Sequence, residues 1–361
     1  MIRTAPALTA LLPELRGASR IAMDTEFHSE RWYFPRLMLL QLRADDREPV
    51  LIDPLAISLA PLAEPLRDRP IVVHGGQQDA QILYRLLGIT PNIVFDTQIA
   101  AGLVGAGYPI RLQELTRRYT GVQMDKGETM SDWSRRPLTD SQAGYAAEDV
   151  QVLGALVDAL REEVERHGRT AAMDSAVSEM LASVRAEPDD DNAWRRVGGA
   201  QLLDDSERAC LRALTAWRDR EARVRDVPKN MLASDGSLLD LARRRPETAQ
   251  EIRANRRMPG HLSRQEAEAV LGLLAEPGPP PPRLPRDRAG FDAIRAASRA
   301  DERRTGVAAE LLLPDGEIHR VLDRRSVASW RKNLMTSELS AFIDGNSSFT
   351  LPALAGEHTI S

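Results

Sequence analysis

The sequence predicts an α/β domain, a mixed β-sheet covered by helices, followed by two small all-α domains. Over the first half, short apolar runs come first in series and then alternate with segments of helical period. Beyond about residue 186, helix caps and helical periods continue without strand-like runs. The chain has 361 residues, which exceeds one ordinary core, because domains typically hold about 100 to 200 residues. The chain is therefore expected to be multidomain.

Five short apolar runs are the predicted strands. Runs over 21–27, 37–42 and 50–52 follow one another as a meander, whereas 71–73 and 93–95 are β-branched runs separated by a helical segment. A mixed sheet is the arrangement that this order favours.

Periodicity and caps place the helices of the first half. Residues 77–87 carry apolar side chains at helical spacing up to Gly88, and a second helix is expected over 96 to about 103. Residues 125–139 show no period and predict a long functional loop. Thr139 and Gln142 then form a capping box that opens a helix ending near Gly168.

The second half is divided by two breaks. An acidic, Pro-containing stretch over 186–192 predicts a linker, and a proline-rich stretch over 278–285 predicts a stiff spacer. Four short helices are expected between them, the last opened by a Ser263 and Glu266 capping box. The predicted divisions are a first domain over 1–185, a linker over 186–203, a helical domain over 204–276, a spacer over 277–288, a second helical domain over 289–345 and a flexible tail over 346–361.

Composition excludes several classes of protein. No apolar run approaches the roughly 20 residues that cross a bilayer, and the N-terminus lacks the pattern of a signal peptide. Cys210 is the single cysteine, which excludes an intramolecular disulfide framework and a cysteine zinc site and fits a reducing cytoplasm. A formal charge of -5 requires any nucleic-acid binding to rest on local patches.

Four acids stand where strands end or helices begin. Alternation along a strand places Asp24 and Glu26 on one face, with Thr25 on the other. Paired carboxylates repel unless one is protonated or a divalent cation lies between them, although an isolated Asp-x-Glu is most often a solvated strand end. Asp79 follows the strand over 71–73, and Tyr145 lies one helical turn before Asp149 on the same face.

Three runs carry a family resemblance: Ile-Ala-Met-Asp24-Thr-Glu26-Phe, His74-Gly-Gly-Gln-Gln-Asp79, and the segment from Ser131 to Val150 that contains Tyr145 and Asp149. They resemble the three exonuclease motifs of bacterial ribonuclease D, the tyrosine-bearing branch of the Asp-Glu-Asp-Asp exonucleases. Residues 214–228 with 238–246 are similar to the helicase and ribonuclease D C-terminal (HRDC) domain, and the last helical region resembles a second, more divergent copy. The resemblance implies a ribonuclease H-like exonuclease fold with two HRDC-type domains.

The resemblance also implies a chemistry. Two Mg²⁺ or Mn²⁺ ions would be held by the four acids, with Asp24 bridging both, Glu26 and Asp149 completing the first and Asp79 holding the second. Tyr145 would orient the attacking water. The implied enzyme is a monomer that releases nucleoside 5′-monophosphates from RNA 3′ ends, in particular those of transfer RNA precursors. A DNA exonuclease in repair and a non-catalytic nucleic-acid-binding scaffold are the alternatives.

Candidate nucleic-acid contacts are weaker, because each has an ordinary structural explanation. Phe27 and Trp133 could stack on bases or pack in the core, and His74 could face the site or be hydrogen-bonded within the fold. Charged loop and helix residues could meet phosphate or remain solvated; these are Lys126, Arg135, Arg136, Arg243, Arg244, Arg245, Arg256 and Arg257. Residues 207–275 carry 14 Lys and Arg against 10 Asp and Glu, an excess of 14 - 10 = 4, which favours weak binding independent of sequence.

Overall fold

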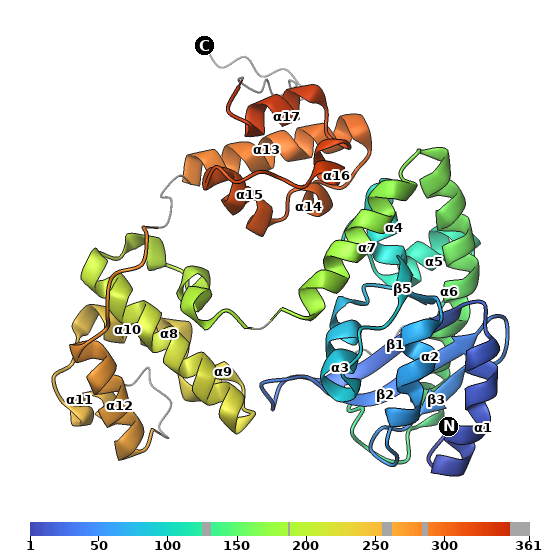
Figure 1. Ribbon diagram of the computed structural model, residues 1–361, viewed down its shortest axis with the longest axis horizontal. Coiled ribbons are helices and arrows are strands. Elements are labelled where there is room, and N and C mark those ends of the chain that lie inside the picture. The colour runs from blue at the N-terminus through green and yellow to red at the C-terminus, as the bar shows by residue number, and fades with distance from the viewer. Residues whose placement is uncertain (125–130, 187, 255–261, 284–287, 347–361) are drawn as a thin grey trace. The chain divides into compact units, whose positions relative to one another are not determined.

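The computed structural model describes residues 1–124, 131–186, 188–254, 262–283 and 288–346, and they form two compact units (Figure 1). Unit 1 comprises residues 1–26, 37–186 and 287–361, and unit 2 comprises residues 27–36 and 187–286. Lys126, Arg256, Arg257 and nearly all of the expected tail over 346–361 lie outside the described residues. Within the described parts of the chain, no helix has the length and apolar character needed to cross a bilayer.

A five-stranded sheet forms the centre of unit 1, in the order β3-β2-β1-β4-β5. Its strands are β1 (Ile21–His28), β2 (Arg36–Ala44), β3 (Val50–Ile52), β4 (Ile71–Val73) and β5 (Ile93–Asp96). β2 and β3 pair antiparallel, whereas β4 is parallel to both β1 and β5. The predicted mixed sheet is therefore confirmed, and it puts the acidic strand β1 in the middle.

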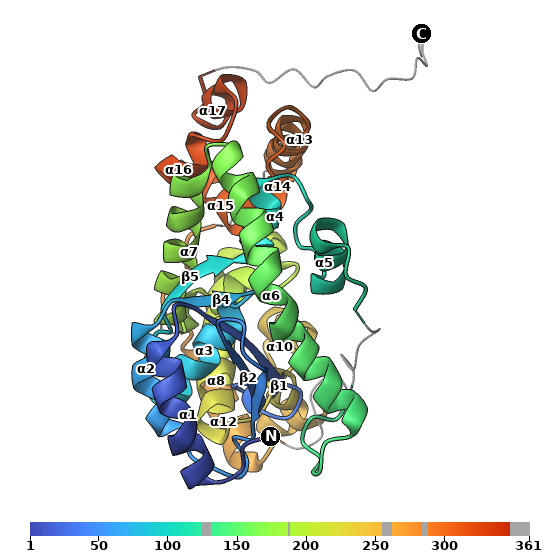
Figure 2. The same cartoon turned by 90° about the vertical axis from the view of Figure 1, so that its right-hand side faces the viewer.

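Among the described residues up to Val184, the helices of unit 1 are α1 (Ala5–Gly17), η1 (Ala60–Leu62), α2 (Ala63–Asp68), α3 (Gln77–Leu87), α4 (Thr97–Leu103), α5 (Leu112–Thr120), α6 (Asp140–Arg166) and α7 (Thr170–Val184). The long α6 contacts β3, β4 and α4 (Figure 2). It begins at the predicted capping box, in which the Thr139 hydroxyl accepts from the backbone N–H of Gln142 and the Gln142 side chain accepts from that of Thr139. Capping fixes the first turn of α6, and with it the direction in which Tyr145 and Asp149 project.

The last helical region packs against α4 and α7 of the same unit. Its helices are α13 (Arg288–Thr305), α14 (Ala309–Leu312), α15 (Asp315–Leu322), α16 (Ser329–Lys332) and α17 (Ser337–Ile343). α14 contacts α4 and α16 contacts α7 (Figure 2). The backbone N–H of Ala308 donates to the carbonyl oxygen of Gly102 at 2.9 Å, and the Arg331 guanidinium pairs with Glu179 on α7. The region expected over 289–345 is thus part of the body of unit 1.

Glycines allow the close approach of these two surfaces. A Cβ on Gly102 would lie 3.0 Å from Cδ2 of Leu311, and a Cβ on Gly105 would lie 2.8 Å from the backbone oxygen of Gly306. The Arg169 guanidinium spans the boundary by donating to the carbonyl oxygens of Leu103 and Thr305.

Unit 2 has its own hydrophobic core, built by η2 (Asp190–Arg196), η3 (Ala200–Leu202), α8 (Asp205–Arg225), α9 (Lys229–Leu232), α10 (Asp235–Arg244), α11 (Ala249–Ala254) and α12 (Arg264–Ala275). The linker expected over 186–203 is wrong for most of its length, because Trp194, Val197 and Ala200 are buried in this core. The helix after Pro246 begins at Ala249. Cys210 is buried.

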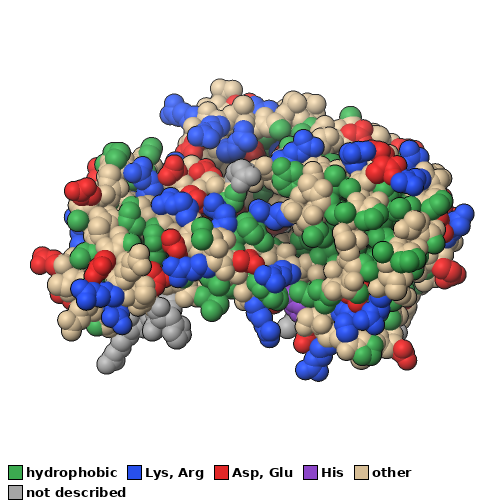
Figure 3. Space-filling model, turned by 60° about the horizontal axis from the view of Figure 1, so that its bottom comes forward, with side chains coloured by type: hydrophobic (Ala, Val, Ile, Leu, Met, Phe, Trp, Pro, Cys, Tyr) green, Lys and Arg blue, Asp and Glu red, His purple; other side chains and the backbone are tan. Residues whose placement is uncertain are grey.

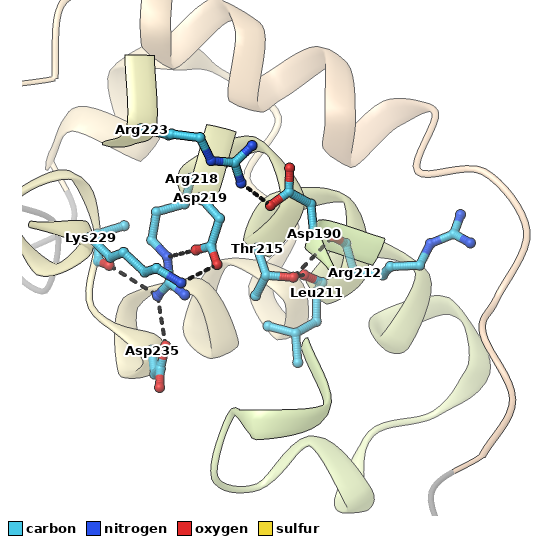
Figure 4. Close-up of polar contacts among 10 residues, drawn as sticks. Asp190, Leu211, Arg212, Thr215, Arg218, Asp219, Arg223, Lys229 and Asp235 are labelled. Carbon is cyan, nitrogen blue, oxygen red and sulfur yellow. Dashed lines mark hydrogen bonds and ion pairs between the residues drawn. The ribbon is translucent and has the colours of Figure 1, made fainter. Parts of the chain in front are cut away.

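Ion pairs join α8 to the helices that follow it in unit 2. Buried Arg218 pairs with its neighbour Asp219 at 3.0 Å and with Asp235 at 2.6 Å, and Lys229 pairs with Asp219 at 2.5 Å (Figure 4). Because the cations and anions in this cluster satisfy one another, we assign it a structural role.

Candidate active site

Three acids from two elements meet in unit 1. Asp24 and Glu26 lie on β1, and Asp149 lies on α6 three helical turns from its capped start. One carboxylate oxygen from each of the three lies within 4.8 Å of the others. The expected side-by-side placement of Asp24 and Glu26 is therefore present, and α6 brings the third acid to the same point.

The acids are destabilised when ionised, because they are shielded from water and repel one another. Burial, followed by the charge of Asp149, raises the pKa of Asp24 to about 7. Burial and then the charges of Asp24, Asp149 and Asp79 raise that of Glu26 to about 9. Burial also raises the pKa of Asp149 to about 7. The cluster therefore retains protons at neutral pH or takes up a cation.

The residues fit a divalent metal. Carboxylate oxygens are the ligands that Mg²⁺ prefers, and three of them converge here. In addition, Oδ1 of Asp149 is buried and has no hydrogen-bond partner among the described residues. A buried acceptor without a donor is costly, and coordination of a cation would satisfy it.

Asp79 stands beside this group rather than within it. It is buried in the first turn of α3, and its carboxylate accepts a hydrogen bond from the Thr25 hydroxyl. Burial and then the charge of Asp24 raise the pKa of Asp79 to about 8. The charge of Asp24 helps to raise the pKa of both Glu26 and Asp79, so Asp79 is electrostatically coupled to the acid cluster.

Tyr145 lies one turn before Asp149 on α6. A hydrogen bond from the Tyr145 hydroxyl opposes the rise in the pKa of Asp149, which places this hydroxyl at the acid cluster. The Trp133 ring packs against Tyr145, with 6.3 Å between ring centroids and 39° between planes. Trp133 is 2% exposed, so in this conformation it supports Tyr145 and presents no face to a base.

Several predicted nucleic-acid contacts have partners within the fold. The Arg136 guanidinium donates to both carboxylate oxygens of Asp53, at 2.8 and 2.9 Å, and to backbone carbonyl oxygens. The His74 ring nitrogens contact Oγ1 of Thr97 at 2.8 Å and the carbonyl oxygen of Ile110 at 3.0 Å. Arg136 and His74 are therefore held by the protein, whereas Phe27 is partly buried and Arg135 is exposed beside Asp132.

Three of the predicted basic residues of unit 2, Arg243, Arg244 and Arg245, are described by the structure and are exposed at the end of α10. Arg244 pairs with Asp240 at 3.0 Å, and the Arg245 guanidinium donates to the Ser206 hydroxyl at 2.6 Å. Across the face drawn in Figure 3, Lys and Arg side chains are interspersed with Asp and Glu.

Two carboxylates that shape the site were not identified from the sequence. Asp53 anchors Arg136, and Asp96 accepts from the backbone N–H groups of Gly75 and Gly76 ahead of α3. The sequence shows only their local roles: Asp53 precedes a proline at a strand end, and Asp96 is an N-cap residue. Neither feature indicates which residues the two carboxylates contact.

Comparisons with known proteins agree with the geometry. Residues 1–165 match the 3′-5′ exonuclease family model, and residues 207–274 match the HRDC domain. The chain is 38% identical to ribonuclease D of Gluconacetobacter diazotrophicus, over 82% of this chain and 76% of the relative, and 33% identical to that of Escherichia coli, over 94% and 96%. It is also similar to the crystal structure of Escherichia coli RNase D, with a TM-score of 0.82, 29% identity and coverage of 96% of this chain and 99% of the other.

Proposed function

The chain belongs to the ribonuclease D family and is a 3′-5′ exoribonuclease, and from this we propose that it trims structured RNA with two divalent ions held by Asp24, Glu26, Asp79 and Asp149. The observation that carries the proposal is the convergence of Asp24, Glu26 and Asp149 around a buried, unpartnered oxygen of Asp149. Such an oxygen-only donor set suits Mg²⁺ or Mn²⁺.

Each acid has its own role in this proposal. When bound, the ions lower the pKa of the attacking water and stabilise the charge that develops at the scissile phosphate. Glu26 and Asp149 would hold the first ion and Asp79 the second, and Asp24, whose charge acts on both Glu26 and Asp79, would serve both. Tyr145 orients the attacking water with its hydroxyl, since a phenol of pKa about 10 is a poor base at neutral pH.

The proposed substrate is a transfer RNA precursor with a free 3′ end. Two observations support a structured RNA: the Escherichia coli relative is described as an exoribonuclease involved in structured RNA processing, and residues 207–274 match the HRDC domain. The exposed arginines at the end of α10 offer contacts to phosphate that do not depend on base sequence.

The test uses matched RNA and DNA strands, labelled at either end, and a transfer RNA precursor with a 3′ extension. With Mg²⁺ or Mn²⁺, 5′-labelled RNA should shorten stepwise, 3′-labelled RNA should release a labelled nucleoside 5′-monophosphate, and chelator should stop both reactions. Equal degradation of DNA would favour the repair exonuclease instead.

Asp24→Asn tests the site assignment. It should abolish degradation without unfolding the protein, because it removes the shared ligand and relieves carboxylate repulsion. Asp140→Asn is the matched control, since Asp140 is an exposed acid in the first turn of α6, the helix that carries Asp149. Near wild-type activity in Asp24→Asn would contradict the proposal.

A further inference from the structure

Asp79 is held differently from the other three acids. It lies outside the group of oxygens formed by Asp24, Glu26 and Asp149, and its carboxylate accepts from the Thr25 hydroxyl. Thr25 and Asp79 are each 6% exposed, so bulk water does not compete freely for this hydrogen bond. A donor of this kind restricts the directions in which a carboxylate can point.

The backbone that carries Asp79 is fixed separately. The Asp96 side chain, 1% exposed, accepts from the N–H groups of Gly75 and Gly76, both at 2.9 Å, and from Gln98 at 2.8 Å. A Cβ on Gly76 would lie 2.5 Å from Cγ2 of Val73, so the turn that leads into α3 is tightly packed. With the start of α3 held in this way, the rotamer of Asp79 is the remaining freedom, and Thr25 controls it.

We propose that Thr25 is a positioning residue, whose hydroxyl holds the Asp79 carboxylate in the orientation that completes the second metal position. The inference rests on the proposed two-metal function. The residue between Asp24 and Glu26 thus serves the site from the opposite side of the strand: β1 supplies two ligands directly and orients a third through Thr25.

The experiment compares Thr25→Val, which removes the hydroxyl at nearly constant shape, with Thr25→Ser, which keeps it. Thr116→Val is the matched control, because Oγ1 of Thr116 is buried and has no partner among the described residues. Mn²⁺ binding to the full-length, RNA-free enzyme is measured by calorimetry, and the Mg²⁺ dependence of RNA degradation is measured in parallel.

Thr25→Val should weaken the second Mn²⁺ binding step and raise the half-saturating Mg²⁺ concentration, each about tenfold. The reason is the loss of the hydrogen bond from the Thr25 hydroxyl to the charged Asp79 carboxylate, because about 1.4 kcal/mol corresponds to a tenfold change in an equilibrium constant. Turnover at saturating Mg²⁺ should stay within about threefold of wild type, since no metal ligand is removed. Thr25→Ser and Thr116→Val should behave like the wild type. In an Asp79→Ala background, Thr25→Val should have no further effect on metal binding.

Unchanged metal binding in Thr25→Val would overturn the inference, and so would tighter binding, which would mean that the hydroxyl competes with the metal. An equal loss in Thr25→Ser would assign the effect to packing and overturn it as well. If Thr25→Val does not fold, Thr25→Ala, which also removes the hydroxyl, is measured in its place, alone and in the Asp79→Ala background. Failure of the proposed function looks different: the wild type would then bind no Mn²⁺, and Asp24→Asn would remain active.

Discussion

The two C-terminal regions are both built from helices, yet they are held in place differently. The HRDC region belongs to unit 2 and buries its own core around Trp194, Leu214 and Leu238. The region from α13 to α17 belongs to unit 1, where a backbone hydrogen bond from Ala308 to Gly102 and an ion pair attach it to α4 and α7. Resemblance between two segments therefore does not imply that both are independent modules.

The difference changes what each region can contribute. Arg243, Arg244 and Arg245 at the end of α10 in the HRDC region are exposed, so an RNA phosphate could reach their guanidinium groups. In the last region, Arg331 is 8% exposed in its side chain and is committed to Glu179 and to the Trp330 ring. We infer that the first region serves RNA binding and that the second completes the body of the catalytic unit.

The largest expected effect comes from removing residues 287–361. The truncated protein should lose at least roughly 10 °C in Tm, because several buried contacts on α4 and α7 become exposed and Arg169 and Glu179 lose their partners. Circular dichroism and an RNA degradation assay would measure this. A fragment over 187–286 is the counterpart and should unfold cooperatively by itself. A truncated protein as stable and active as the full chain would show that the last region is a detachable module.

The second prediction uses pH and metal. The pKa values of Asp24, Glu26 and Asp79 are raised to about 7 to 9 in the folded protein. These carboxyl groups therefore contribute fully to the free energy of unfolding below their pKa in the unfolded chain, near pH 4, and the contribution is lost as the pH rises through their pKa values in the folded protein. A Mn²⁺ concentration that is 100 times the dissociation constant at pH 8.5 should stabilise the protein by about 2 to 3 kcal/mol there. The same concentration should stabilise it less at pH 6, where protonated carboxyls bind the metal more weakly.

Hydrogen exchange shows where that stabilisation is felt. With Mn²⁺ at pH 8.5, peptides from α4, α7 and α13 should become protected together, while peptides from α8 and α10 should not change. If α4 and α7 became protected without α13, the last helical region would not be stabilised together with the rest of unit 1, and the proposed difference between the two C-terminal regions would be wrong.

Arg331→Ala should destabilise the full chain by about 1 to 2 kcal/mol, because it removes a nearly buried cation from a half-exposed carboxylate. Arg244→Ala is the matched control in the HRDC region, where the pair with Asp240 involves a 72% exposed arginine and should contribute about 0.5 kcal/mol or less. Urea unfolding followed by circular dichroism measures both, and equal effects would argue against a special attachment at α16.

The smallest effect is expected for RNA affinity. Replacing Arg243 and Arg244 by Ala should weaken binding of a long RNA a few-fold and reduce the slope of log affinity against log salt by up to about 1.4, at roughly 0.7 per phosphate contact. Arg303→Ala, an exposed arginine of α13, should leave the slope unchanged. Fluorescence anisotropy in Ca²⁺ measures the slopes, and a larger effect of Arg303→Ala would reverse the assignment of roles.

Local patterns predicted the elements because the forces that select them are local. The capping box at Thr139 and Gln142, the helix stop at Gly88 and the alternation of Asp24 and Glu26 all appear in the structure. Trp194 was missed because its neighbours are polar and acidic, although a single large buried side chain is enough to bring a segment into a core.

Long-range partners were not predictable from these patterns. Arg136 was an even choice between phosphate and solvent, but its partner is Asp53, 83 positions away in sequence. The attachment of the last region depends on isolated glycines such as Gly102 and Gly105, whose value lies in the surface opposite them. A charge or a glycine is visible in a sequence, whereas the atom that it meets is set by the fold.

The glycine contacts also limit exchange of segments between relatives. Because any side chain at Gly105 would collide with the backbone of Gly306, a chimera that joins this catalytic domain to another protein's last helical region needs compatible residues on both surfaces. Such a hybrid should be assembled by transferring α4 and its following turn together with α13 to α17, whereas the HRDC region, with its own core, should be exchanged together with residues 27–36 of the same unit.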